Sequence, residues 1–311
     1  MGEREIVEAL ARTLPSNENT VIGAGDDCAS VRLPKEGRTL LLKTDAVVEG
    51  VHFSSEDPPQ LVGRKALARC LSDIAAMGGA PDSALITLGV PADRDHSFLM
   101  KLYEGLNALA VKYDVAIVGG ETTRCPGGLF ISVALTGYAG PEGGIQRAGS
   151  LVGDAIFVSG QLGGSLSGQH LEFEPRVNES RWLVEHFMPH AMIDVSDGLG
   201  MDLGHLLRAG GVGALVDESF IPVSRAAKIR ARDKVSDKSP LLAALTDGED
   251  FELLFTVASS DAVAVKDGWQ AEFPDLPLSL IGQIESDSGL RLKGRNGIRS
   301  IDGIYGYDHF E

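Results

Sequence analysis

Residues 40–53, LLLKTDAVVEGVHF, decide how the rest of the chain is interpreted. The apolar start of this stretch is typical of a buried strand. We expect that strand to end at Lys43-Thr44-Asp45, so that a hydroxyl and a carboxylate emerge side by side. Gly50 permits a tight turn, which brings His52 within reach of whatever Asp45 binds. Oxygen ligands of this kind suit Mg²⁺, although an ordinary hydrogen-bonded Asp turn explains the same residues equally well.

The composition is that of a soluble globular protein with room for two domains. Of the 311 residues, 43% are hydrophobic and 23% are charged, and no apolar run approaches the roughly 20 residues that cross a bilayer. The first residues lack the regions of a signal peptide, and the three cysteines show neither disulfide nor zinc spacing, so we expect a cytoplasmic protein. The net charge of −16 argues against nucleic acid as a partner, because phosphate contacts need a basic surface.

Alternating helices and strands predict an α/β or α+β fold in two domains. Helices are expected at residues 3–14, 61–77 and 97–113 and from residue 199, and strands at residues 40–42, 84–90, 115–118, 129–138, 155–159, 191–195, 251–257 and 279–284. The glycine-rich segment 139–150 is the expected linker. It divides the chain into an N-terminal domain, residues 1–140, and a C-terminal α/β domain, residues 141–311.

The usual phosphate-binding loops are missing from the sequence. It has no Walker A segment, no Gly-x-Gly-x-x-Gly after a strand and no protein-kinase signature. Acidic residues at turns, strand ends and helix starts offer another way to hold phosphate, through bound cations. They are Asp26, Asp27, Asp45, Asp73, Glu121, Asp194, Asp197, Glu249 and Asp250. Two carboxylates about 4 Å apart repel by about 4 kcal/mol at an effective dielectric near 20, so a cluster of them requires cations or shared protons.

Several of these residues also have a purely structural explanation. Asp73 is spaced to pair with Arg69 one helical turn away. Ser196 and Asp197 are good helix-capping residues, although the same helix start can receive a phosphate through its free amides. Arg147 is explained equally well by a solvated surface position. The residues by themselves therefore indicate Mg²⁺-dependent phosphate chemistry and leave the substrate open.

Taken together, eight segments resemble the thiamine-monophosphate kinase family, a member of the superfamily that includes aminoimidazole ribonucleotide synthetase. They are GAGDDCASV (23–31), KTDAVVEGVHF (43–53), GRKALARCLSDIAAMGGAP (63–81), GGETTR (119–124), QRAGSLVGD (146–154), IDVSDGLGMDLGHLL (193–207), DGEDFELLFTV (247–257) and GYDHF (306–310). The segments follow the family's order over nearly the whole chain. EGVHF, LSDIAAMG and GYDHF separate this family from its superfamily relatives.

The resemblance implies ATP-dependent phosphorylation of thiamine monophosphate to thiamine diphosphate by direct phosphoryl transfer. ATP is then a co-substrate, and several Mg²⁺ ions are the cofactors. The implied fold is the two-domain aminoimidazole ribonucleotide synthetase-like fold, whose N-terminal domain binds ATP and Mg²⁺ and joins its sheet to a second copy in a barrel across a homodimer. The alternatives are another ATP-dependent reaction of the superfamily, such as amidine cyclisation, and a non-catalytic binder of nucleotide or thiamine phosphate. We expect no nucleic acid or membrane partner.

By position, the resemblance also assigns roles to individual residues. The expected Mg²⁺ ligands are Asp27, Thr44, Asp45, Asp73, Glu121, Asp194 and Asp197. The expected ATP contacts are Tyr103, Gly120, Glu121, Arg147 and Ser196. The expected substrate contacts are His52 and Glu249, together with Ile304 or Tyr305 just before the terminal GYDHF. No side chain is expected to form a covalent intermediate.

Four positions depart from the family's pattern. Asp247 replaces a glycine that is usual before Gly-Glu-Asp. Glu121 stands where Asp is usual, which lengthens the ligand by one methylene. Ile304 falls where an aromatic residue often stacks on the substrate, and Tyr305 beside it is a candidate substitute. Lys43 stands where many members have Ser or Thr beside the metal, so its ammonium is a candidate to replace one Mg²⁺ ion.

Overall fold

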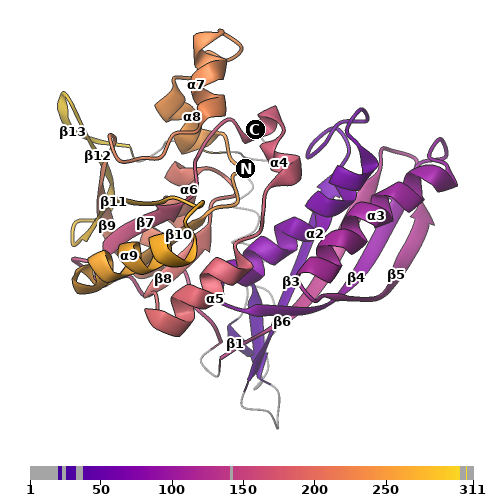
Figure 1. Cartoon of the computed structure of the whole chain (residues 1–311), viewed down its shortest axis with the longest axis horizontal. Coiled ribbons are helices and arrows are strands. Elements are labelled where there is room, and N and C mark those ends of the chain that lie inside the picture. Colours follow the sequence, from indigo (N-terminus) through magenta and orange to yellow (C-terminus); the bar gives the residue numbers. More distant parts are fainter. Residues whose placement is uncertain (1–19, 23–25, 33–37, 141–142, 302–305, 307–311) are drawn as a thin grey trace.

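The structure, a computed structural model, describes residues 20–22, 26–32, 38–140, 143–301 and 306. These residues form two β-sheets that lie side by side, each with its own helices (Figure 1). The helix expected at residues 3–14 lies outside the described residues. Within the described ranges, every helix is too short or too polar to span a bilayer.

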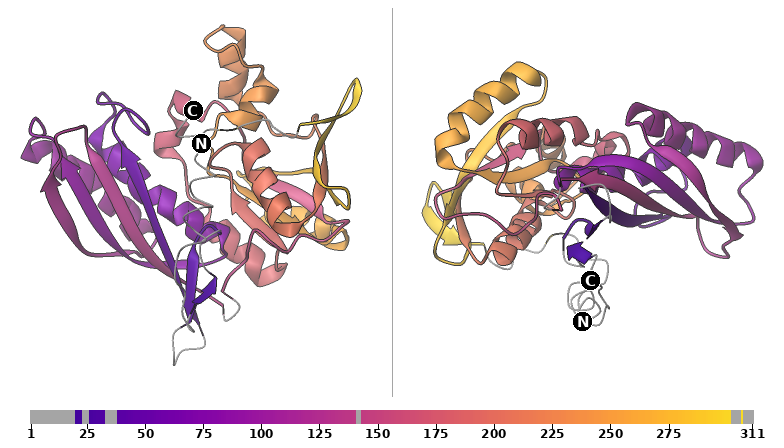
Figure 2. Two further views of the ribbon diagram at one scale, coloured as in Figure 1. Left: turned by 180° about the vertical axis from the view of Figure 1, so that it is seen from behind. Right: turned by 90° about the horizontal axis from the view of Figure 1, so that it is seen from below.

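Six strands form the first sheet, in the order β1-β2-β3-β6-β4-β5. Their bounds are Thr20–Ile22 (β1), Ala29–Arg32 (β2), Thr39–Val48 (β3), Ala80–Val90 (β4), Ala116–Arg124 (β5) and Phe130–Ala139 (β6). Neighbouring strands are antiparallel except β4 and β5, which are parallel and are joined by helix α3 (His96–Lys112). Helices α2 (Pro59–Ala76) and α3 cover one face, and no helix of the described chain covers the other (Figure 2).

Seven strands form the second sheet, in the order β13-β12-β9-β11-β7-β10-β8. Their bounds are Ala155–Ser159 (β7), Ala191–Asp194 (β8), Gly213–Asp217 (β9), Leu253–Val257 (β10), Leu278–Glu285 (β11), Gly289–Gly294 (β12) and Gly297–Ser300 (β13). Only β9 and β12 are parallel neighbours among these described strands.

Both faces of the second sheet are covered by helices. The bounds of the remaining helices are Ser165–Ser167 (η1), Gln169–Glu172 (α4), Val177–His186 (α5), Leu199–Gly210 (α6), Arg225–Arg232 (α7), Pro240–Thr246 (α8), Ser259–Asp261 (η2) and Ala262–Glu272 (α9). Leu183 of α5 and Trp269 of α9 pack in one buried cluster, while Leu203 of α6 and Leu245 of α8 pack in the other. The predicted two-part α/β architecture is therefore confirmed, although the described chain shows no closed barrel.

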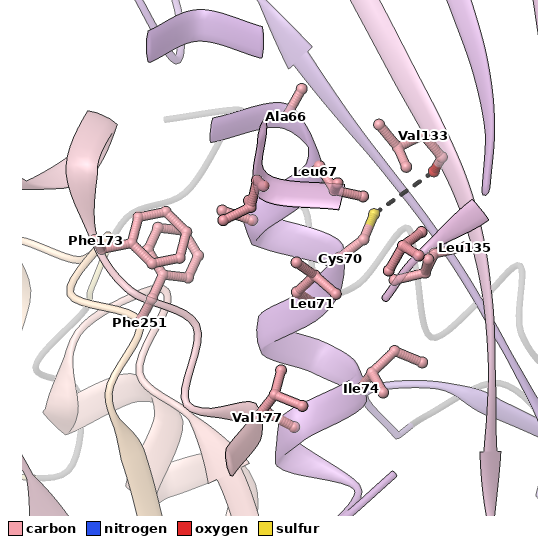
Figure 3. Packing of buried hydrophobic residues seen from close by; sticks show 14 of the residues in the cluster. Ala66, Leu67, Cys70, Leu71, Ile74, Val133, Leu135, Phe173, Val177 and Phe251 are labelled. Atoms are coloured by element: carbon pink, nitrogen blue, oxygen red, sulfur yellow. Dashed lines mark hydrogen bonds between the residues drawn. The ribbon is translucent and has the colours of Figure 1, made fainter. Parts of the chain in front are cut away.

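Helix α2 is packed from both sides. It contacts β3 and β6 of the first sheet, and α4, α5 and β8 of the second half of the chain. Figure 3 shows Val133 and Leu135 on one side of the helix and the stacked rings of Phe173 and Phe251 on the other. Cys70 of α2 donates a hydrogen bond from Sγ to the Val133 carbonyl at 3.6 Å. One hydrophobic core therefore runs from the first sheet through α2 into the second half.

Two predictions about strands were wrong. Strand β3 continues to Val48, so Lys43, Thr44 and Asp45 lie in its middle. Because successive residues of a strand point to opposite faces, Thr44 lies on the open face of the sheet while Asp45 faces α2. Strand β5 continues to Arg124, so residues 119–124 are extended along β4 and are not a loop. The other predicted elements within the described residues are confirmed, with ends that shift by a few residues.

The shared core predicts that damage to α2 destabilises both halves together. Leu71 is fully buried, so Leu71→Ala should lower the free energy of unfolding by about 2–5 kcal/mol. Both tryptophans, Trp182 and Trp269, lie in the second half, so their fluorescence reports on that half alone. In denaturant titrations the fluorescence and circular dichroism midpoints should fall together.

Val111→Ala is the matched control, because Val111 on α3 is 82% exposed and should change stability by less than about 0.5 kcal/mol. A Leu71→Ala protein whose tryptophan transition stays at its original midpoint would show that the two halves unfold independently.

Candidate active site

A cavity of about 290 Å³ lies beside α2, between residues from the two halves of the chain. Seven carboxylates and three cationic side chains line it. Nine of the predicted site residues are among the lining, namely Asp27, His52, Asp45, Asp73, Arg147, Asp194, Ser196, Asp197 and Glu249. The sequence therefore named most of the groups that the fold brings together here.

Strand β3 and helix α2 exchange two ion pairs across the cavity wall. Lys43 Nζ lies 2.7 Å from Asp73 Oδ1, and Arg69 Nε lies 3.0 Å from Asp45 Oδ2. Lys43 and Asp45 share a face of β3, while Arg69 and Asp73 lie one turn apart on α2. Asp73 thus pairs with the strand and not with Arg69, contrary to the structural explanation offered by their spacing.

Three buried carboxylates converge behind these pairs. Asp27, Asp73 and Asp194 each offer an oxygen, and these atoms lie within 4.8 Å of one another. Asp27 is paired with Arg147, whose Nη2 is 2.9 Å from Oδ1, and Asp194 accepts a hydrogen bond from the Ser72 hydroxyl at 2.5 Å. Hard oxygen ligands so close together in a buried site fit Mg²⁺, and a divalent cation would offset their repulsion.

The electrostatics of the cluster have a clear physical cause. Burial raises the pKa of Asp73 well above its usual range, against the opposing effect of Lys43. Burial, followed by the charge of Asp27, raises the pKa of Asp194 to about 6. Burial therefore disfavours the ionised form of both carboxylates, and a bound divalent cation would favour it.

Glu249 is held by two cations of α2. Lys65 Nζ lies 2.7 Å from Glu249 Oε2, and Arg69 Nη1 lies 3.2 Å from Oε1. The Lys65 side chain is fully buried and also donates to the His52 carbonyl at 2.6 Å. Glu249 has a φ of 55° and Phe251 a φ of 51°, a left-handed backbone that is costly for such residues. The fold thus maintains strain to present this carboxylate at the cavity.

The start of α6 corrects the capping explanation for Ser196 and Asp197. The capping position is Gly198, and no side chain caps this helix. The Asp197 amide instead donates to Asp202 Oδ2 at 3.0 Å, while the side chains of both predicted residues line the cavity. Asp202 is itself buried, and burial raises its pKa well above the usual range.

Four predicted residues lie away from this cavity within the single chain. Thr44 is on the open face of the first sheet, Gly120 and Glu121 are on β5, and Tyr103 packs against the core from α3. At Gly120 an added Cβ would lie 1.8 Å from the Ile86 carbonyl oxygen, so close strand packing already requires glycine there. Ile304 and Tyr305 lie outside the described residues.

Sequence reasoning missed three residues that help to organise the site. Arg69 was considered only as a possible helical partner of Asp73, and Lys65 and Ser72 were given no role in the site. Their signal was the spacing of charges along α2, since residues 65, 69 and 73 fall one turn apart. What that spacing cannot reveal is that this charged face is turned inward.

Comparison of the whole chain with known proteins shows its family. Residues 25–139 match the family model described as AIR synthase related protein, N-terminal domain, and residues 133–295 match the corresponding C-terminal domain. The thiamine-monophosphate kinase of Rhodopirellula baltica is 39% identical, over 90% of this chain and 87% of that protein. The enzyme of Salmonella typhimurium is 35% identical, over 98% and 97%. This chain belongs to the thiamine-monophosphate kinase family.

Solved structures place the family's fold on this chain. AaThiL complexed with AMPPCP and TMP superposes with a TM-score of 0.84 at 32% identity, covering 99% of this chain and 97% of that one. Thiamine-monophosphate kinase from Stenotrophomonas maltophilia K279a gives a TM-score of 0.74 at 33% identity, with coverages of 93% and 95%. HypE of E. coli, a hydrogenase maturation protein, reaches 0.73 at 21% identity, with coverages of 96% and 97%, and so shares the fold alone.

The raised pKa of Asp194 predicts how the metal-free protein responds to pH. A carboxyl whose pKa is raised on folding favours the folded state below its unfolded pKa, and this contribution is lost as pH rises through the folded value. Without divalent cations, stability should therefore fall between about pH 4 and pH 7. Asp194→Asn keeps an acceptor for Ser72 but removes the charge. Its free energy of unfolding at pH 8 should therefore exceed that of wild type by roughly 2–3 kcal/mol.

The same substitution should reduce the stabilisation that added Mg²⁺ gives. Asp217→Asn is a suitable control, because Asp217 is on β9 away from the cavity. If Asp194→Asn melts earlier than wild type at pH 8 without metal, the ionised Asp194 carboxylate does not destabilise the metal-free protein, contrary to this prediction.

Proposed function

We propose that the protein transfers the terminal phosphoryl group of ATP to the phosphate of thiamine monophosphate, giving thiamine diphosphate and ADP. The observation that carries this proposal is the cavity in which buried Asp27, Asp73 and Asp194 meet the cations Lys43, Arg69 and Arg147. Buried carboxylates and fixed cations suit phosphate groups carried with Mg²⁺. The full-length match to thiamine-monophosphate kinases supplies the substrate.

In this proposal the residues divide by function. Asp27, Asp73, Asp194 and Asp197 hold Mg²⁺, which when bound neutralises charge on the phosphate oxygens. Arg147 and Ser196 contact ATP, and His52 and Glu249 contact the thiamine phosphate. Thr44, Glu121, Gly120 and Tyr103 remain proposed contacts, and so do Ile304 and Tyr305. Asp45 lines the cavity and is paired with Arg69.

The proposed reaction needs positioning more than acid–base chemistry. An oxygen of the acceptor phosphate forms a bond to the γ-phosphorus of ATP while the bond to the β-phosphate oxygen breaks, and ADP leaves. The acceptor oxygen carries no proton that a base must remove when its phosphate is ionised. Lys65 and Arg69 hold Glu249, and Arg147 holds Asp27, so the groups that face the substrates are fixed before binding.

We also propose that the protein is a cytoplasmic homodimer whose first sheets join in a barrel, and that its domains divide at residues 140 and 141. Leu42, Leu85 and Val118 support the dimer, because they lie on the open face of the first sheet and are 40%, 49% and 66% exposed. A second copy of the same sheet would cover this apolar face. Gly120 and Glu121 on β5 then lie near the joined edge.

A turnover assay tests the reaction directly. Incubation with ATP, Mg²⁺ and thiamine monophosphate, followed by chromatography, should yield thiamine diphosphate, and a chelator of divalent cations should abolish it. Thiamine monophosphate that remains unconverted while it still binds would identify a non-catalytic binder. ATP consumption with another acceptor alone would identify a different reaction of the superfamily.

Asp197→Ser separates function from stability at the start of α6. Serine keeps a small polar side chain beside the capping position Gly198, so the melting temperature without ligand should change little. Turnover should fall at least about a hundredfold, because a carboxylate for the metal is lost. ATP with Mg²⁺ should also no longer raise the melting temperature.

A mutant that melts much earlier yet keeps near-normal turnover per folded molecule would make Asp197 a structural residue. Asp267→Ser is the control, because Asp267 lies on α9 outside the cavity lining.

Leu85→Glu tests the dimer. Placing a carboxylate on the open face of each sheet should weaken association at least about tenfold, because like charges would meet in an apolar interface. Sedimentation velocity measures the result, with Val111→Glu on the exposed side of α3 as control. An unchanged dimer in Leu85→Glu would move the interface elsewhere.

A further inference from the structure

The two ion pairs between β3 and α2 have an arrangement that balances charge locally. The strand offers Lys43 and then Asp45, the helix offers Arg69 and then Asp73, and each cation pairs with the carboxylate of the other element. Two carboxylates thereby meet two fixed positive charges. A single divalent cation between Asp45 and Asp73 would supply the same charge.

The rest of the cavity is not balanced in this way. Asp194 accepts a hydrogen bond from the neutral Ser72 hydroxyl at 2.5 Å. Asp73 lies at the border, since Oδ1 contacts Lys43 while the carboxyl group also belongs to the cluster with Asp27 and Asp194. On one side of the cavity Asp45 and Asp73 are each paired with a cation, whereas on the other side Asp27 is paired with Arg147 and Asp194 accepts its hydrogen bond from a neutral hydroxyl.

We propose that Lys43 and Arg69 take the place of a divalent cation between Asp45 and Asp73, so that bound metal is confined to the side of the cavity formed by Asp27 and Asp194. This inference rests on the proposed function, because it assumes that metal and phosphate meet in this cavity. Within it, Lys43 and Arg69 are fixed cations of the phosphate site, and Asp45 positions Arg69 and binds no metal.

Two observations favour this division. The Lys43 ammonium lies 2.7 Å from Asp73 Oδ1. A metal ion that took the Asp73 Oδ1 position would have to displace that ammonium. The bond to Asp73 also uses one of the three N–H donors of Lys43, which lines the cavity and keeps donors for phosphate oxygens.

Arg69 is fixed more firmly than Lys43. Its Nε bonds to Asp45 at 3.0 Å and its Nη1 to Glu249 at 3.2 Å, so two carboxylates on different elements orient one guanidinium. The side chain also lies over the Phe251 ring, with Cζ 5.8 Å from the centroid. A planar cation held at both ends suits a fixed electrostatic role better than a mobile one.

Counting bound metal tests the inference without using turnover. The bound Mn²⁺ ions per protomer are counted by electron paramagnetic resonance in the presence of the ATP analogue AMPPCP, at one fixed concentration of free Mn²⁺. Lys43→Ser combined with Arg69→Ala opens the position between Asp45 and Asp73, so this protein should bind one more Mn²⁺ per protomer than wild type. Adding Asp45→Asn to that variant should remove the extra ion, which locates it.

Lys112→Ser is the matched control, because Lys112 is also ion-paired, with Glu174 at 2.8 Å, but lies on α3 away from the cavity. Its metal count should equal that of wild type. If the double variant does not fold, the single substitutions Lys43→Gln and Arg69→Gln, which introduce side chains of similar size, take its place. Each should then bind one more Mn²⁺ per protomer than wild type. An unchanged number of ions in every folded cavity variant, even with tighter binding, overturns the inference.

The outcome is separable from that of the proposed function. A wild-type protein that makes no thiamine diphosphate would refute the function while the metal count still decides the roles of Lys43 and Arg69. A wild-type protein that makes thiamine diphosphate and whose variants gain no ion would keep the function and refute this inference.

Discussion

The structure depends on a helix that has no free side. An ordinary surface helix buries one stripe and presents its charged residues to water. Helix α2 is enclosed between the first sheet and the second half of the chain, so its charged residues have no solvent to face. Lys65 and Asp73 are both buried, and each forms an ion pair with a residue of another segment. The cavity is the place where this enclosed polar face meets the middle of β3 and the end of β8.

Burial explains why the site's charges are so ordered. A charge removed from water is tolerated only when it is paired and hydrogen-bonded. The cations beside Asp45, Asp27 and Glu249 meet this requirement within the protein, while Asp194 accepts a hydrogen bond from the neutral Ser72 hydroxyl. The contrast between the two kinds of carboxylate is therefore visible before any ligand binds.

Much of this could be predicted from the sequence, and the failures have physical reasons. The spacing of apolar residues and the positions of glycines were enough to predict α2, α3, α6 and most strands. The carboxylates Asp27, Asp73 and Asp194 were among nine acidic candidates at turns, strand ends and helix starts, and the family resemblance implied their assignment as Mg²⁺ ligands. Thr44 was expected to emerge beside Asp45 because the predicted end of β3 was too early. In the longer strand the two side chains point to opposite faces of the sheet.

Other features depend on contacts between distant segments, which a single sequence does not display. Lys65 is indistinguishable from a solvated helix lysine until the second half of the chain covers it. Capping residues were expected at Ser196 and Asp197 because their types favour caps, yet the loop at Gly248 and Glu249 hydrogen-bonds to this segment, and Gly198 becomes the capping position. In both cases tertiary packing overrides a local preference.

The continuous core also constrains how a chain of this kind can diverge by recombination. Two halves joined by a glycine-rich connection look like modules that related genes can exchange at that point. Here the second half supplies Phe173 and Phe251, whose rings are fitted to the shape of a helix that belongs to the first. A recombination crossover between β6 and β7 would combine α2 from one parent with Phe173 and Phe251 from the other. Chimeras of this family should therefore inherit α2 together with the segments that cover it, even though these are far apart in the gene.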